Sequence, residues 1–173
     1  EYQKAWNYAS TIHNGQKLPA SEIPYINHLG LVAMEAMTAV ACESVENPDI
    51  LVLCALSHDS IEDTSATYED VKEHFGTQIA DGVAALTKNT ALPSKTEQMK
   101  DSLARIRMQP KEVWMVKLCD RITNLQPPPA HWDSAKIAVY QTEARLIFDQ
   151  LCEASPLLAD RLAEKIANYD QYR

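Results

Sequence analysis

The distribution of apolar and polar residues along the 173-residue chain indicates helices throughout. No stretch alternates clearly between apolar and polar residues with a period of two, and only 4 glycines are present. We therefore expect an all-α fold, a single bundle of about eight to nine helices. The expected helices cover residues 2–14, 26–44, 48–59, 67–75, 77–88, 94–108, 110–125, 134–153 and 156–170, where 67–75 and 77–88 can count as one bent unit. Loops are expected at 15–24, 60–66, 89–93 and 126–133.

Residues that start and stop helices support these boundaries. Polar residues that can cap a helix N-terminus precede four of the expected helices, and a proline follows directly at two of them. A glycine and a run of prolines mark helix ends. These signals are Asn47-Pro48, Thr67 to Asp70, Ser94 to Glu97 and Ser155-Pro156 for starts, and Gly76 and Pro127 to Pro129 for ends.

Two of the expected helices are apolar on nearly all sides, which is typical of buried helices. The first, 48–59, runs from Ile50 to Leu56 without a polar residue and ends in the pair His58-Asp59. The second, 110–125, carries Asp120 in its second half. A buried helix gives the side chains at its end a rigid geometry, so these residues are candidates for a functional site. The alternative for Asp120 is a surface charge near a helix end.

The composition limits the classes of function. The length suits one domain, residues 1–173, with a sizeable core. A formal charge of −8 argues against nucleic-acid partners and requires local cations at any site for an anion. No apolar run approaches the ~18 residues of a membrane span, and no signal-peptide pattern opens the chain. The chain begins at Glu1 and not at a methionine, so we expect further N-terminal residues to precede it.

The cysteines lack the short spacing of a zinc knuckle or a redox motif, and each lies in an apolar stretch. We expect them to be reduced and packed, as in a cytoplasmic protein. They are Cys42, Cys54, Cys119 and Cys152.

Two imidazoles and two carboxylates form the strongest candidate site: His28, His58, Asp59 and Asp120. This mixed donor set suits Mn²⁺, Fe²⁺, Ni²⁺ or Zn²⁺ better than a metal selected by thiolates. Four protein ligands on a six-coordinate ion leave two positions open, as metal-assisted hydrolysis requires. A His-Asp pair alone is weak evidence, because chance alone supplies such pairs in many sequences.

The segments around these residues resemble the HD-domain phosphohydrolases, and specifically the alarmone hydrolase domain of the RelA/SpoT family. The segments are PYINH, ending at His28, HDSIEDT, starting at His58, the HFG turn at His74 to Gly76, and KLCDRITNL around Asp120. The resemblance runs from about His13 to Tyr140. Nothing in the chain corresponds to the synthetase and regulatory domains of long family members, so it resembles the small stand-alone branch that includes the metazoan SpoT homologues.

The resemblance implies roles for residues beside the four proposed ligands. It assigns the catalytic work to Glu62 and Asp63, which can orient and deprotonate an attacking water. Without the family, this pair reads equally well as a solvated turn. Asn124 matches a substrate-contacting asparagine, and its alternative role is capping a helix end.

Candidate contacts to substrate phosphates are the cations Lys17, Lys95 and Lys136, with Tyr140 one turn after Lys136. The family places arginine where this chain has Lys17 and Lys136, and lysine is a point charge without the planar fork of arginine. An exposed lysine beside a packed tyrosine is the alternative for Lys136 and Tyr140. The remaining histidines, His13, His74 and His131, are not expected to bind metal.

The implied activity is metal-dependent removal of the 3′-diphosphate from (p)ppGpp, which gives GDP or GTP plus pyrophosphate. The expected cofactor is one Mn²⁺, with other divalent transition metals open, and the expected partner is a small nucleotide, with no nucleic acid and no membrane. Adenine alarmones are possible additional substrates. Two alternatives stay open: a nucleotide phosphatase of the same superfamily acting on NADPH or another nucleotide, and a binding protein that has lost turnover. The oligomeric state and the base preference do not follow from the sequence.

Overall fold

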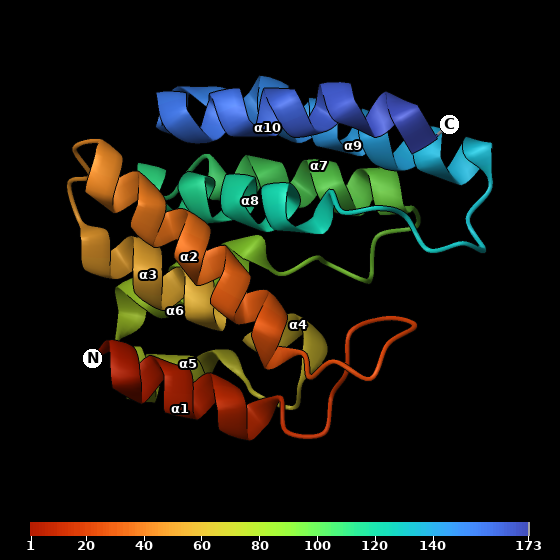
Figure 1. The fold of residues 1–173 in the computed structure, drawn as a ribbon. Coiled ribbons are helices and arrows are strands. Elements are labelled where there is room, and N and C mark those ends of the chain that lie inside the picture. The colour runs from red at the N-terminus through yellow and green to blue at the C-terminus, as the bar shows by residue number, and fades with distance from the viewer. Residues whose placement is uncertain (173) are drawn as a thin grey trace.

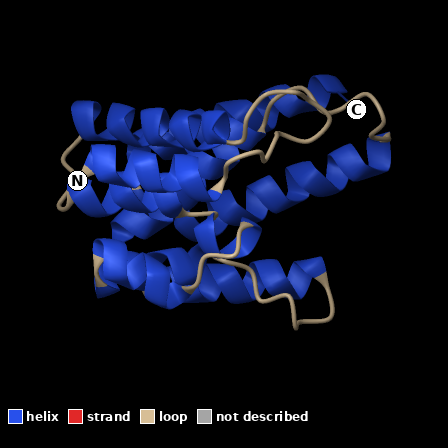
Figure 2. Cartoon of the chain, turned by 90° about the horizontal axis from the view of Figure 1, so that it is seen from below, coloured by secondary structure: helices blue, strands red, loops and turns tan. Residues whose placement is uncertain are grey.

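The computed structural model describes residues 1–172 and contains ten α-helices and two short 3₁₀ helices. Within those residues the only β-type pairing is an isolated bridge between Lys17 and Pro24. Figure 2 shows helices joined by loops, which confirms the all-α prediction. The helices are α1 (Tyr2–Ile12), α2 (Ile26–Cys42), α3 (Pro48–Ser57), α4 (Ser60–Asp63), α5 (Tyr68–Phe75), α6 (Thr77–Leu86), α7 (Lys95–Ile106), α8 (Lys111–Asn124), α9 (Ser134–Leu151), η1 (Cys152–Ala154), α10 (Pro156–Asn168) and η2 (Tyr169–Tyr172).

The helix starts follow from the predicted caps. The Thr67 side chain accepts a hydrogen bond from the Asp70 N–H, and the Asp70 carboxylate accepts one from the Thr67 N–H at 2.7 Å. Ser94 and Ser155 cap α7 and α10 in the same way through their hydroxyl oxygens. Asn47 stands at the expected N-cap of α3, but its side chain makes no capping bond. Its backbone N–H donates instead to the buried carboxylate of Glu112, at 2.8 Å.

The helices stack in layers around α3 and α8 (Figure 1). Helices α2, α3 and α8 pack against one another, α9 and α10 cover the far side of α8, and α1 covers α3. One continuous core of buried apolar side chains runs from Ala5 on α1 to Tyr169 on η2. Both helices that were expected to be buried all round, α3 and α8, lie inside this core. Among the described residues, no helix combines the length and the apolar character needed to cross a bilayer.

Residues 60–63 differ from the prediction, which placed a loop over 60–66. They form the single turn α4, because the Asp63 N–H donates to the Asp59 carbonyl at 2.9 Å and Thr64 Oγ1 donates to the Ser60 carbonyl at 2.6 Å. Ile61 packs this turn against the core. Four residues are too few to give a periodic pattern, so the sequence could not reveal the turn. It holds Glu62 and Asp63 in a defined place directly after His58 and Asp59.

Leu51→Ala is expected to destabilise the protein by about 2–5 kcal/mol, because it leaves a cavity in the core. Leu51 is fully buried on α3, the helix that ends at the candidate site. Leu31→Ala is the matched control, since Leu31 on α2 is 47% exposed and surface changes cost within about 0.5 kcal/mol. Denaturant unfolding of both variants measures the difference. Equal losses would show that α3 does not contribute to the core as described.

Candidate active site

Four side chains from three helices meet at the end of α3. His28 comes from α2, His58 and Asp59 follow α3, and Asp120 comes from α8. His28 Nε2 lies 3.4 Å from Asp120 Oδ1 and 3.6 Å from Asp59 Oδ2. His58 Nε2 lies 2.9 Å from Asp59 Oδ2 and 3.8 Å from Asp120 Oδ1. One donor atom each from His28, His58 and Asp120 lies within 4.8 Å of the others, which is the convergence that a shared ion requires.

The orientation of His58 fits a metal ligand. Its Nδ1 lies 2.9 Å from the Ala55 carbonyl oxygen, which can only accept, so Nδ1 carries the proton. This hydrogen bond leaves the Nε2 lone pair directed at the carboxylates, as is usual for histidines that bind metal through one nitrogen. His58 Nε2 is buried, and its contact with Asp59 Oδ2 at 2.9 Å lacks the geometry of a hydrogen bond. The donor set and the nitrogen that faces two carboxylates together fit a divalent cation.

The electrostatics of the cluster favour added positive charge. Burial lowers the pKa of His58, but the larger combined effect of Asp59 and Asp120 raises it to about 9, so a bound cation would take the place of a proton on Nε2. Burial raises the pKa of Asp59, but the adjacent His58 lowers it to about 2. The pKa of Asp120 lies well below its usual value, because Lys117 and the two histidines outweigh its burial. Two ionised carboxylates in a buried place therefore attract a cation.

The two carboxylates of α4 lie beside this cluster, and both line the same cleft. Glu62 accepts hydrogen bonds from the backbone N–H of Lys88 at 2.9 Å and from the Lys88 ammonium at 2.6 Å. Asp63 is exposed and lines the cleft. Its pKa is raised, because burial partly desolvates it and Asp59 is close. Lys88 therefore holds Glu62 in place, whereas Asp63 remains exposed.

Partners on α2 and α8 orient the two acidic residues of the cluster. The Tyr25 hydroxyl donates to Asp59 Oδ2 at 2.6 Å. The Lys117 ammonium donates to Asp120 Oδ2 at 2.9 Å, and the Asn124 amide donates to Asp120 Oδ1 at 2.5 Å. Asn124 thus bonds to a side chain of the site and not to a backbone carbonyl at the helix end. Such bonds fix the orientation of groups that would bind a metal.

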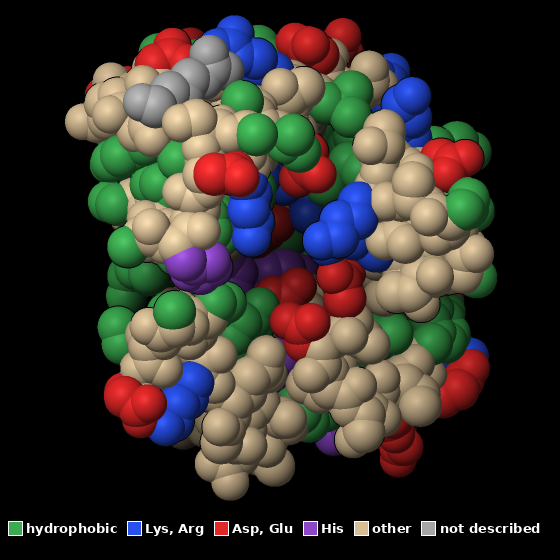
Figure 3. Space-filling model, turned by 90° about the vertical axis from the view of Figure 1, so that its right-hand side faces the viewer, with side chains coloured by type: hydrophobic (Ala, Val, Ile, Leu, Met, Phe, Trp, Pro, Cys, Tyr) green, Lys and Arg blue, Asp and Glu red, His purple; other side chains and the backbone are tan. Residues whose placement is uncertain are grey.

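The cluster opens into a cleft of about 640 Å³. Figure 3 shows the hollow from the right-hand side of Figure 1, with acidic, basic and histidine side chains gathered around it. Lys95, Lys136, Tyr140 and Asn124 line this cleft together with the cluster. The Lys136 ammonium lies 4.5 Å from the centre of the Trp132 ring, which meets the Tyr140 ring edge-on at 5.1 Å. The cleft therefore offers cations and aromatic rings at its rim and carboxylates on its floor.

Lys17 is not among the residues that line the cleft. Its ammonium forms an ion pair with Glu22, and both side chains are exposed. The reason lies in the 15–24 loop, which folds back on itself through the Lys17–Pro24 bridge and the bond from the Leu18 N–H to the Ile23 carbonyl. That closure was not visible in the sequence. The structure thus brings together every candidate site residue except Lys17.

The sequence interpretation gave no role to four further residues that line the cleft: Tyr25, Lys88, Lys117 and Arg121. Tyr25, Lys117 and Arg121 lie inside the segments that resemble the family, so their position beside the proposed ligands could have identified them. Lys88 lies 26 residues from Glu62 in the chain and has no such signal. The Arg121 guanidinium is buried and stacks on the Tyr140 ring at 4.5 Å.

The histidines that were not expected to bind metal stay outside the cluster. The buried ring of His13 stacks on Tyr25 at 5.2 Å, and its Nδ1 lies 2.6 Å from Gln16 Oε1. His74 Nδ1 lies 2.8 Å from the Asp70 carbonyl oxygen on α5. His131 does not line the cleft.

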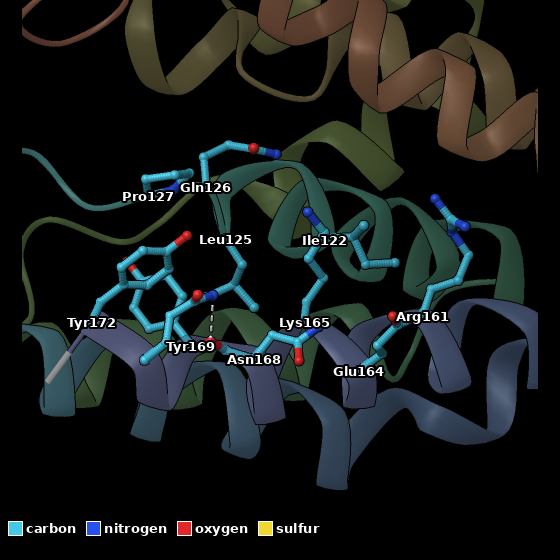
Figure 4. Close-up of a pocket in the computed structure, with 11 residues that line it drawn as sticks. Ile122, Leu125, Gln126, Pro127, Arg161, Glu164, Lys165, Asn168, Tyr169 and Tyr172 are labelled. Carbon is cyan, nitrogen blue, oxygen red and sulfur yellow. Dashed lines mark hydrogen bonds between the residues drawn. The ribbon is translucent and has the colours of Figure 1, made fainter.

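A second hollow, of about 310 Å³, lies where the end of α8 meets α10 (Figure 4). Figure 4 shows Gln126 and Pro127 facing Lys165, Asn168 and Tyr172 across it. Among the described residues that line this hollow there is no histidine, and the one carboxylate, Glu164, belongs to an exposed residue. It lacks the converging donors of the larger cleft, which is therefore the candidate active site.

Comparisons with known proteins identify the family of this chain. The profile of the HD domain family matches residues 5–157. A guanosine-3′,5′-bis(diphosphate) 3′-pyrophosphohydrolase of Aquifex aeolicus is 34% identical over 73% of this chain, although the chain spans only 17% of that protein. The enzyme MESH1 of Mus musculus, which carries the same activity in its name, is 31% identical over 79% of this chain and 76% of its own length. A solved structure of a metazoan ortholog of SpoT that hydrolyzes ppGpp superposes with a TM-score of 0.82 at 26% identity, covering 96% of this chain and 94% of that one.

Proposed function

This chain belongs to the HD-domain family and, within it, to the branch of small alarmone hydrolases that includes MESH1, and on that premise we propose that it is a (p)ppGpp 3′-pyrophosphohydrolase. The reaction removes the 3′-diphosphate as pyrophosphate and leaves GDP, or GTP from the pentaphosphate. The observation that carries the proposal is the arrangement of the cleft floor. Three donors suited to a divalent metal converge there, the Asp59 carboxylate lies 2.9 Å from one of them, and two further carboxylates line the same cleft.

Membership of the HD-domain family implies a divalent metal. We propose that His28, His58, Asp59 and Asp120 hold one Mn²⁺, a metal for which a mixed imidazole and carboxylate set is suitable. When bound, such an ion polarises phosphoryl oxygens and stabilises the charge that develops on them. Tyr25, Lys117 and Asn124 would keep the acidic ligands in place through the hydrogen bonds described above.

Glu62 and Asp63 are the groups proposed to move protons. A water oxygen must bond to the phosphorus that carries the 3′-oxygen, the bond between this phosphorus and the 3′-oxygen must break, and the leaving oxygen must gain a proton. A carboxylate that accepts a proton from the water can return one to the leaving oxygen. The raised pKa of Asp63 makes its carboxylate a stronger proton acceptor than an ordinary aspartate.

Lys95, Lys136, Tyr140 and Asn124 are proposed to hold the substrate beyond the reacting phosphorus. The overall charge of −8 repels an anionic nucleotide, so lysines at the rim must provide local attraction. Lys136 is exposed, and its ammonium lies against Trp132, where it can meet a phosphate at the mouth of the cleft. Lys17 is not part of this proposal, because it pairs with Glu22 away from the cleft.

Lys136→Ala is expected to raise KM several-fold at low salt with little change in kcat, because a phosphate contact remote from the scissile bond acts mainly on binding. The increase should shrink at high salt, where screening already weakens the contact. Initial rates at two ionic strengths measure both effects. Lys165→Ala on α10, outside the cleft, is the matched control. An unchanged KM at low salt would remove Lys136 from the site.

The comparisons do not favour the alternative of a phosphatase for NADPH, since the relatives are named for ppGpp hydrolysis. A substrate panel tests the proposal directly. Guanosine and adenosine 3′-diphosphate nucleotides, NADPH and deoxynucleotides would each be incubated with Mn²⁺ and with EDTA. We expect release of pyrophosphate from ppGpp that EDTA abolishes, and the adenine alarmone as a second substrate because lysines select poorly among anionic nucleotides. Turnover of NADPH alone would refute the proposal.

We also propose that residues 1–173 act as one hydrolase domain in the cytoplasm. One continuous core spans the described part of the chain, which supports a single domain. The cysteines are free thiols, and burial raises the pKa of Cys54 to about 12, so that it stays protonated and unreactive. Cys54 and Cys119 are packed as expected, but Cys42 is exposed and Cys152 is only partly buried, so the expectation that all four are packed was wrong. Free thiols suit a reducing compartment. The proposed partner is the nucleotide substrate.

A further inference from the structure

The contact between Lys88 and Glu62 is the feature of the cleft that the roles above leave unexplained. Lys88 donates to both oxygens of the Glu62 carboxylate, through its backbone N–H at 2.9 Å and its ammonium at 2.6 Å. The side chains are 34% and 23% exposed, so the pair is shielded on most sides. Burial lowers the pKa of Lys88, but the bond to Glu62 and the charges of the nearby carboxylates together raise it more, which keeps the ammonium charged.

The backbone that carries Lys88 is fixed from α7. The Arg105 guanidinium donates to the carbonyl of Ala85 at 3.1 Å and to that of Thr87 at 2.7 Å. Ser102 Oγ also donates to the Ala85 carbonyl, at 2.9 Å. These donors satisfy carbonyls at the C-terminal end of α6 that have no partner within the helix. Lys88, two residues beyond the end of α6, is therefore an anchored group and not a free surface lysine.

Glu62, in contrast, belongs to a helix of one turn. Its carboxylate could rotate towards solvent if nothing held it, because two oxygens on a flexible side chain have several open orientations. A displacement of about 1 Å can cost roughly 10²-fold in rate when a reacting group must be held in line. A fixed ammonium bonded to one oxygen and a fixed N–H bonded to the other would prevent that displacement.

We propose that Lys88 is a positioning residue that acts through Glu62, holding its carboxylate in the orientation needed to take the proton from the attacking water. This inference rests on the proposed function, since it assigns Lys88 a place in that reaction. The Lys88 ammonium points at a carboxylate and not at open cleft, so its contribution is to rate and not to the capture of phosphate. The Lys88 ammonium and the Glu62 carboxylate then contribute jointly to the same proton transfer.

The first test compares kcat and KM for variants of Lys88. Lys88→Met removes the ammonium and keeps most of the side chain. We expect kcat to fall roughly tenfold or more with KM nearly unchanged, the pattern of an interaction that matters only in the transition state. Lys88→Arg, which restores a donor cation, should recover much of the rate. Lys72→Met, which removes an exposed lysine on α5, is the control for the charge change. Thermal unfolding and metal content of each variant check that the fold and the metal site are intact.

The decisive test is a double-mutant cycle with Glu62→Gln. If Lys88 acts through Glu62, adding Lys88→Met to Glu62→Gln should lower kcat by no more than about twofold, because the two residues contribute as one unit. Independent losses that multiply would overturn the inference and make Lys88 a separate substrate contact. A rise in KM without a fall in kcat would overturn it as well. Failure of the wild-type chain to hydrolyse ppGpp refutes the proposed function instead, so the two failures are distinguishable.

Discussion

Asp59→Ala is expected to abolish turnover and to weaken metal binding in the same variant. Asp59 Oδ2 reaches both histidines of the cluster, at 2.9 Å from His58 Nε2 and 3.6 Å from His28 Nε2. Its removal takes away a proposed ligand together with half of the negative charge that attracts the ion. Loss of a partner outside the ligand shell costs about 10–100-fold in metal affinity, and loss of a ligand should cost more. Calorimetric titration with Mn²⁺ and a ppGpp turnover assay measure the two effects.

The matched control for this variant is Asp160→Ala on α10, which removes an exposed carboxylate and should leave metal binding and rate unchanged. The test depends on whether Asp59→Ala loses metal binding and turnover together. If Asp59→Ala bound Mn²⁺ as tightly as the wild type, Asp59 would not be a ligand. If the variant lost metal and still turned over substrate, the metal would have no place in the reaction.

Much of the fold could be predicted because its signals are local. Thr67, Ser94 and Ser155 cap helices that begin where their hydroxyl groups can accept from the chain two or three residues on. The apolar run in α3 predicts burial whatever lies around it. Asn47 shows the limit of this reasoning. It stands at the predicted N-cap position, but its hydrogen bond runs from its backbone N–H to Glu112, 65 residues away in the sequence.

The candidate site likewise contains residues that local sequence patterns predict and residues that they do not. His28, the His58-Asp59 pair and Asp120 stand in recognisable segments, so their convergence could be anticipated from the resemblance. The link between Lys88 and Glu62 could not, because no pattern in the sequence joins two residues that meet only through the packing of α4 on α6. The prediction that Lys17 lies at the site was wrong for a related reason. The 15–24 loop closes through its own backbone bonds, and residue types alone do not predict where such a loop directs a side chain.

Glu62→Gln is expected to keep the metal and to lose turnover by roughly 10²-fold or more, the scale of a general acid–base contribution. The amide has nearly the shape of the carboxylate, but it cannot accept a proton from water at neutral pH. It also loses the charge that pairs with the Lys88 ammonium at 2.6 Å. Glu62 lies outside the four converging donors, so metal binding should be unaffected.

Single-turnover rates with bound Mn²⁺ and a separate metal titration show whether Glu62 binds the metal or accepts the proton. Glu73→Gln on α5 is the control, since Glu73 is exposed and does not line the cleft. A variant of Glu62 that loses the metal would be missing a ligand, and one with full activity would leave Asp63 as the group that takes the proton. Loss of rate with the metal retained would mean that the cleft separates the two tasks: the residues on α2, after α3 and on α8 hold the ion, and a carboxylate of the short turn α4 moves the proton.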